Sequence, residues 1–327
     1  MKPPMSLSRR TFLTHTALAT LAVAAGPAAL TPARHLHATT PPVPLPPMPL
    51  SVFSKHLQWL DYDAMAEVAA EVGFDGVDLA VRPGGHVLPE RVATDLPRAV
   101  RAVQKQGLQV VQITTAIARA DDPLSRQVLA TAAQLGIRYY RTDWLKYDQS
   151  TSISAQQARF ERQLRTLTLL NREVGIRGSY QNHAGADYFG APVWDLAQVL
   201  KNIRSEYLGC QYDIRHATLE SAQSWPIGLG IIQPFVNTLV LKDAKWAEVK
   251  GRWQIVDTPI GEGRVDFPAF FRQLKASGLR VPVSIHFEYE MPEHNASLSA
   301  TAKRQQTIQV MKKDLATLRS YLKQAGL

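Results

Sequence analysis

Short apolar segments alternate with amphipathic segments along most of this 327-residue chain. The apolar segments have the length of buried strands, and their nearly continuous hydrophobicity is typical of parallel strands covered on both faces. They occupy eight positions along the sequence: 50–53, 76–81, 108–114, 137–141, 176–182, 208–213, 238–242 and 283–288.

Most of these segments are followed by a stretch in which apolar residues recur at the helical period. The expected helices lie at about 62–72, 92–103, 124–135, 160–174, 194–203, 225–235, 267–276 and 298–324. Glycines stand where five of these helices end, as helix caps often do: Gly73, Gly107, Gly136, Gly175 and Gly278.

Eight strand–helix units predict an α/β fold, a single-domain (β/α)8 TIM barrel over residues 50–327 with a C-terminal helix. An open doubly wound sheet is the alternative fold. It more often has five to seven strands and a glycine-rich first turn, and no G-x-G-x-x-G follows the first strand of this chain.

The N-terminal segment has the three regions of an export signal. Arg9 and Arg10 precede Phe12-Leu13, a mild apolar stretch follows, and small residues come next. Paired arginines followed by Phe-Leu are typical of the twin-arginine type, whose machinery exports folded proteins. We therefore expect a signal over 1–38 with cleavage near Ala38 (25–29 is the alternative), an extended Pro-rich linker over 39–49, and a periplasmic location.

Composition and charge exclude several classes of protein and of binding partner. The chain is 45% hydrophobic and 20% charged with a single cysteine, which excludes an internal disulfide framework and cysteine-based metal clusters. No apolar run is long enough to span a membrane. The net charge of +9 includes four basic residues of the acid-free first 38, and the rest lacks a concentrated basic stripe, so we expect no nucleic-acid partner. The sequence leaves the oligomeric state open.

Polar residues gather at the predicted carboxyl ends of the strands, where TIM barrels carry their chemistry. Five of the six histidines beyond the signal lie there, and only His294 does not. We predict catalytic roles for His183, His216, Lys242 and Glu288. We predict substrate contacts for His56, Arg82, His86, Arg141, Trp144, Asn182, Asp243 and Trp246.

Strand alternation places Gln181 and His183 on one side, and His286 and Glu288 on one side. Asp213 and His216 flank the turn after their strand. Gln181, Asp213 and His286 together offer oxygen and nitrogen donors for Mn²⁺, Mg²⁺ or Zn²⁺. The segment 261–263 suits a tight turn before a helix capped near Asp266 better than a phosphate cradle.

Several segments resemble the xylose isomerase-like TIM barrels, also described as sugar phosphate isomerase/epimerase proteins and related to the endonuclease IV fold. The resemblance spans about residues 50–290. It lies in GFDGVDL from Gly73, YQNH from Tyr180, YDIRHA from Tyr212, LKD from Leu241 and GEGRVDF from Gly261.

This resemblance implies a sugar isomerase or epimerase whose metal is held by Glu, Asp, His and Glu from the last four strands. The corresponding positions are Gln181, Asp213, Val240 and His286, and only Asp213 matches in type. Glu288 becomes the last ligand if the strand register differs by two. The resemblance also implies that His216 contacts substrate.

Three function classes stay open. The favoured one is a carbohydrate isomerase, epimerase or keto-glycoside lyase that abstracts a proton next to a carbonyl. His183 or His216 would be the base, and a metal, or Lys242 with Arg141, would stabilise the oxyanion. The others are an inactive sugar-binding barrel and a DNA-repair nuclease, for which suitably placed ligands are too few. Export favours neutral sugars, glycosides or their keto forms as substrates.

Overall fold

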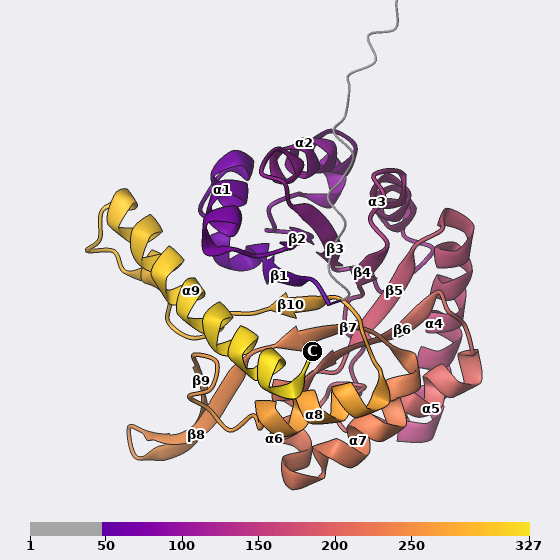
Figure 1. The fold of residues 1–327 in the computed structure, drawn as a ribbon. Helices are drawn as coiled ribbons and strands as arrows, with labels where there is room; N and C mark the ends of the chain where they lie inside the picture. Colours follow the sequence, from indigo (N-terminus) through magenta and orange to yellow (C-terminus); the bar gives the residue numbers. More distant parts are fainter. Residues whose placement is uncertain (1–47) are drawn as a thin grey trace, which may run out of the picture. The chain divides into compact units, whose positions relative to one another are not determined.

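A closed barrel of eight parallel strands forms the centre of the molecule (Figure 1). The computed structural model describes residues 48–327. In order around the barrel the strands are β1 (Leu50–Phe53), β10 (Val283–Ile285), β7 (Val236–Leu241), β6 (Leu208–Asp213), β5 (Arg177–Gln181), β4 (Tyr139–Arg141), β3 (Gln109–Thr115) and β2 (Gly76–Val81), which pairs again with β1. The predicted TIM barrel is confirmed.

Helices surround this barrel. They are α1 (Tyr62–Val72), α2 (Val92–Lys105), α3 (Pro123–Gln134), α4 (Ile153–Val174), α5 (Trp194–Ile203), α6 (Ile214–Ser221), α7 (Trp225–Ile232), α8 (Phe267–Ser277) and α9 (Ala300–Ala325). Short 3-10 turns lie at Ser54–Leu57, Pro89–Arg91, Ala222–Ser224, Gln233–Phe235 and Pro292–His294.

The predicted helix ends are well reproduced because local chemistry sets them. Gly73 and Gly175 follow α1 and α4 with φ of 97° and 78°, a left-handed conformation that glycine adopts without strain. Asp266 caps α8 by accepting a hydrogen bond from the Ala269 backbone N–H, as predicted. Local sequence therefore determines where these helices begin and end.

Two elements differ from the prediction. Residues expected to form a loop after β7 instead form an antiparallel hairpin, β8 (Asp243–Val249) and β9 (Arg252–Thr258), which projects from the barrel (Figure 1). Helix α6 begins directly after β6, and the Asp213 carboxylate caps it by accepting from the backbone N–H of His216 at 3.0 Å. The turn expected between Asp213 and His216 is thus the first turn of a helix.

The last elements of the chain close the barrel against the first. β10 pairs with β1, and α9 packs against both α1 and α8 (Figure 1). Met48 and Pro49, the end of the predicted linker, already pack here: Met48 contacts the core, and the Pro49 carbonyl accepts from the Val283 N–H at 2.9 Å. The predicted signal lies outside the described residues.

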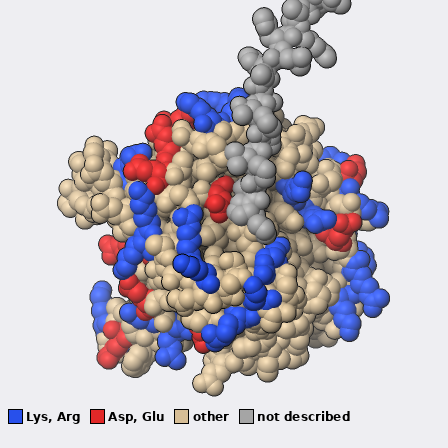
Figure 2. All heavy atoms as spheres, viewed as in Figure 1, with Lys and Arg blue, Asp and Glu red and all other residues tan. Residues whose placement is uncertain are grey.

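Charged side chains are dispersed over one face of the described part of the chain (Figure 2). On the face drawn in Figure 2, Lys and Arg side chains alternate with Asp, Glu and uncharged residues. Among residues 48–327, no helix combines the length and the apolar character needed to cross a membrane.

Candidate active site

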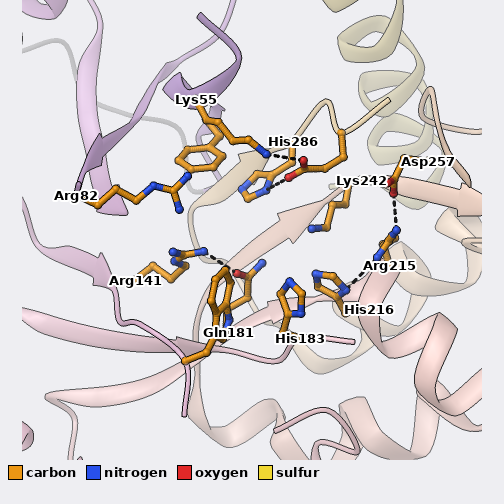
Figure 3. Close-up of a pocket in the computed structure, with 13 residues that line it drawn as sticks. Lys55, Arg82, Arg141, Gln181, His183, Arg215, His216, Lys242, Asp257 and His286 are labelled. Carbon is orange, nitrogen blue, oxygen red and sulfur yellow. Dashed lines mark hydrogen bonds and ion pairs between the residues drawn. The ribbon is translucent and has the colours of Figure 1, made fainter. Parts of the chain in front are cut away.

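A cavity of about 270 Å³ opens at the carboxyl ends of the strands (Figure 3). Nine of its lining residues were predicted from the sequence: Arg82, Arg141, Trp144, Gln181, His183, His216, Lys242, His286 and Glu288. Four were not assigned a role: Phe53, Lys55, Arg215 and Asp257. Its size suits a small molecule such as a monosaccharide.

The Lys242 side chain, which lines this cavity, forms a buried ion pair with Asp213. The Lys242 ammonium, at the end of β7, lies 3.2 Å from Oδ2 of Asp213, and the Gln181 amide donates to the same oxygen at 2.9 Å. Burial raises the pKa of Asp213 above its usual range, although the adjacent ammonium opposes this shift. These contacts fix the Lys242 side chain in a nearly water-free position.

His183, which follows β5, presents one free ring nitrogen. Its Nδ1 lies 2.8 Å from the carbonyl oxygen of Ala184, and a carbonyl only accepts, so Nδ1 carries the proton. Nε2 is then an unprotonated lone pair. Burial, together with the Lys242 charge, lowers the pKa of His183 to about 4, so the ring is neutral at pH 7.

His286, which follows β10, is held in a similar way. Its Nδ1 lies 3.6 Å from Oε1 of Glu288, and its buried Nε2 has no hydrogen-bond partner among the described residues. Burial lowers the pKa of His286 to about 3. Glu288 also pairs with the Lys55 ammonium at 2.7 Å. Burial alone would raise the pKa of Glu288, but His286 and Lys242 lower it, so the carboxylate stays charged.

His216 has the opposite tautomer. The Arg215 guanidinium, which can only donate, approaches His216 Nδ1 at 3.2 Å, so the proton lies on Nε2. That Nε2 is 3.4 Å from Asp213. Arg215 is in turn fixed by Asp257 of β9, at 2.5 Å. His216 is therefore arranged to donate a hydrogen bond rather than to accept a proton.

The family of the chain follows from its sequence and this architecture together. Residues 66–320 match the family described as xylose isomerase-like TIM barrel. The chain belongs to this family. Among curated protein sequences, none matches it significantly.

Solved structures share the fold of this xylose isomerase-like barrel at low sequence identity. D-psicose 3-epimerase from Clostridium cellulolyticum H10 has a TM-score of 0.64 at 12% identity, over 84% of this chain and 99% of that one. The 3-keto-D-glucoside 4-epimerase of E. coli has a TM-score of 0.61 at 16% identity, over 84% of this chain and 99% of that one. The probable 3-DHS dehydratase of Bacillus anthracis has a TM-score of 0.64 at 13% identity, over 83% of this chain and 99% of that one. At these identities the likeness establishes the fold.

The predicted divalent-metal site does not fit the donors that this barrel provides. Oδ2 of Asp213 is taken by Lys242 and Gln181, and the Gln181 carbonyl oxygen accepts from Arg141 at 3.2 Å. Val240, the fourth family position, is buried in β7 and has no donor atom. In residues 48–327 no cluster of three His, Cys, Asp or Glu side chains can hold a metal. Lys242 and Arg141, the two cationic side chains that contact these donors, would also repel a metal cation.

Two predicted substrate residues lie behind the pocket wall in supporting positions. Asn182 donates to the backbone carbonyl of Asp213 and accepts from its N–H, at 3.0 and 2.7 Å, and so joins β5 to β6. His56 Nε2 accepts from the Phe287 N–H at 3.1 Å and is buried. These contacts position Asp213 and the segment that carries His286.

Three further predicted substrate residues lie outside the pocket lining. His86 Nε2 lies 3.2 Å from the Leu60 carbonyl oxygen. The Asp243 carboxylate accepts four backbone N–H groups, two of which belong to the turn at 261–263. This occupancy supports the turn interpretation of that segment over a phosphate cradle. Trp246 is exposed on β8.

The missed residues have different sequence signals. Lys55 and Arg215 are neighbours of predicted site residues, and the strand-end criterion alone would have included them. Phe53 is the last residue of an apolar strand and resembles any core residue. Asp257 enters through the unpredicted hairpin, so only recognition of β8 and β9 would have placed it at the site.

The buried neutral histidines make stability depend on pH. An unfolded histidine binds a proton near pH 6.5, whereas folded His286 resists protonation down to about pH 3, so the free energy of unfolding falls as the pH drops between these values. We expect His286→Asn to reduce this slope by about 1.4 kcal/mol per pH unit between pH 6 and 4. Urea unfolding of the wild type and of His286→Asn at several pH values measures this difference in slope. Equal slopes would show that His286 does not have a lowered pKa in the folded protein.

Proposed function

We propose that this protein is a carbohydrate isomerase or epimerase that removes a proton from the carbon next to a carbonyl group. One observation carries the proposal: two neutral imidazoles, His183 and His286, flank the Lys242 ammonium. Their strands, β5 and β10, stand three positions apart in the ring, and β7, which leads into Lys242, lies between them. Neutral imidazoles can transfer protons, and a buried ammonium can stabilise the oxyanion that forms.

In the proposed first step, the sugar carbonyl oxygen lies at Nζ of Lys242. His183 Nε2 takes the proton from the neighbouring carbon, the C–H electron pair forms a carbon–carbon double bond, and the carbonyl pair moves onto oxygen. Lys242 stabilises the negative charge of this enediolate, and the Nε2–H of His216 is placed to donate a further hydrogen bond.

The returning proton determines the product. For inversion, His286 first takes a proton from solvent at Nε2 and delivers it to the opposite face of the same carbon, while His183 returns the abstracted proton to solvent. Delivery by His183 to the former carbonyl carbon yields the isomer instead. Glu288 positions His286 in this scheme rather than acting on the sugar. Among the two bases that the sequence left open, the tautomers favour His183 over His216.

Solvent proton exchange tests this proposal. Neutral keto-sugars and keto-sugar acids are incubated with the enzyme in heavy water, and NMR follows deuterium at the carbon next to the carbonyl. We expect exchange with at least one sugar, and a fall of about a hundredfold in His183→Asn and in His286→Asn. Asparagine keeps a donor close to the Nδ1 position and removes Nε2.

The control is His294→Asn, because His294 is exposed in the turn before α9 and should retain full activity. Binding of sugars without any exchange would replace the proposal by the sugar-binding barrel. Release of an aglycone from a keto-glycoside, dependent on the same histidines, would make elimination the reaction.

A further inference from the structure

The cavity is lined by more cationic side chains than are paired with a carboxylate. Three of its five cationic side chains have a carboxylate partner: Lys55 pairs with Glu288, Arg215 with Asp257 and Lys242 with Asp213. Arg82 and Arg141 have no ion-pair partner among residues 48–327. Figure 3 shows both guanidinium groups at one end of the cavity, and the charge of Arg82 acts on Arg141.

Arg141 is held rigidly with its charge uncompensated. It is 3% exposed, it donates to the Gln181 side chain and to the Thr115 carbonyl, and its Nε has no hydrogen-bond partner in the described structure. Its guanidinium carbon lies 4.1 Å from the centre of the Trp144 ring. Asp78, a buried acid whose charge acts on Arg141, already accepts hydrogen bonds from Gln112, Thr114 and Ser284.

Arg82 lies free at the same end. Its guanidinium is 5.4 Å from the centre of the Phe53 ring, and the described residues offer it no hydrogen bond. Burial and the like charge of Arg82 lower the pKa of Arg141 to about 10, so Arg141 remains charged at pH 7 and the two guanidinium groups repel each other. Two adjacent guanidinium groups with open donors are the usual recognition elements for a carboxylate or phosphate.

We propose that the substrate is an acidic sugar whose carboxylate or phosphate group binds between Arg82 and Arg141. The inference rests on the proposed function and specifies its substrate class. The anion lies at the β2 and β4 side of the cavity, and this orientation directs the rest of the sugar toward Lys242, His216 and His286 on the β6, β7 and β10 side (Figure 3). The neutral sugars expected from the export signal lack this group.

Calorimetric titration tests the proposal on the full chain. The probes are D-glucuronate against D-glucose, D-galacturonate against D-galactose, and D-glucose 6-phosphate as the phosphate arm. We expect an acidic sugar to bind at least about tenfold more tightly than its neutral counterpart. Arg82→Gln should remove this advantage without lowering the melting temperature, because the Arg82 side chain has no ion pair or hydrogen bond to lose among residues 48–327.

The matched control is Arg272→Gln, an exposed arginine of α8 for which wild-type affinities are expected. Tighter binding of the uronates identifies a sugar acid, and tighter binding of the 6-phosphate identifies a sugar phosphate. The proposal is overturned if acidic and neutral sugars bind equally, if no acidic sugar binds at millimolar concentration, or if Arg82→Gln keeps the preference.

The outcome separates this inference from the proposed reaction. Arg82-dependent binding of an acidic sugar without deuterium exchange for any sugar would retain the anion site and refute the isomerase. Exchange that proceeds equally with neutral sugars and is insensitive to Arg82→Gln would retain the isomerase and refute the anion site.

Discussion

Replacing Lys242 by methionine is expected to lower kcat about a thousandfold, with a smaller change in KM. The ammonium is fixed by Asp213 before the substrate arrives, so it stabilises the enediolate oxygen without reorganisation. Removal of one preorganised donor to a developing oxyanion costs 10²–10³ in rate, and a full charge is worth at least as much. Steady-state kinetics with the sugar identified by proton exchange measure the effect.

The same substitution also removes the partner of a buried carboxylate, which is expected to cost about 3–5 kcal/mol of stability. The double variant Lys242→Met/Asp213→Asn leaves no unpaired charge and should regain most of that stability without regaining activity. A double variant with near wild-type kcat would show that Lys242 acts only in folding. The comparison therefore separates charge stabilisation in the reaction from structural support.

The second large effect concerns Asp243, whose carboxylate organises the loop after the hairpin. Oδ1 accepts from the backbone N–H groups of Ala244 and Val265, and Oδ2 from those of Gly261 and Gly263, at 2.9–3.1 Å. Asp243→Ala leaves four donors unpaired, and each such loss costs about 1–3 kcal/mol before water or rearrangement compensates. We expect a loss of about 3 kcal/mol or more in urea unfolding.

Two variants calibrate this value. Asp243→Asn keeps one acceptor oxygen and should lose about half as much. Asp266→Ala removes a carboxylate from the same loop that accepts a single backbone N–H, and should cost about 1 kcal/mol. If Asp243→Ala were no more destabilising than Asp266→Ala, the four hydrogen bonds would not hold the loop.

The barrel was predictable from sequence because its strands are buried on both faces and therefore nearly all apolar. The hairpin β8–β9 was not, because it is largely exposed and needs no such pattern. Its turn residues, Lys250 and Gly251, have φ of 53° and 74°, which fits a two-residue hairpin turn. Asn-Gly or Asp-Gly at these positions would have predicted a hairpin turn, whereas Lys-Gly is only a weak sequence signal for one.

The site was predictable as a group of strand-end residues but not in its chemistry. Strand alternation correctly placed Gln181, His183, His286 and Glu288 around one cavity. The ring nitrogen that each histidine leaves free depends on contacts such as the Ala184 carbonyl and the Arg215 guanidinium. These contacts arise from tertiary packing. The pairing of Lys242 with Asp213 likewise depends on β6 and β7 lying side by side.

The pairing of β1 with β10 determines when the protein can become complete during its synthesis. Ser51 and Val283 are joined across the barrel seam although 232 positions separate them in sequence. At about 5–20 residues per second, a ribosome needs roughly ten seconds or more to make that intervening chain. For this interval β1 presents an unpaired edge, which a chaperone is suited to protect. The barrel can close only after β10 has emerged from the ribosome.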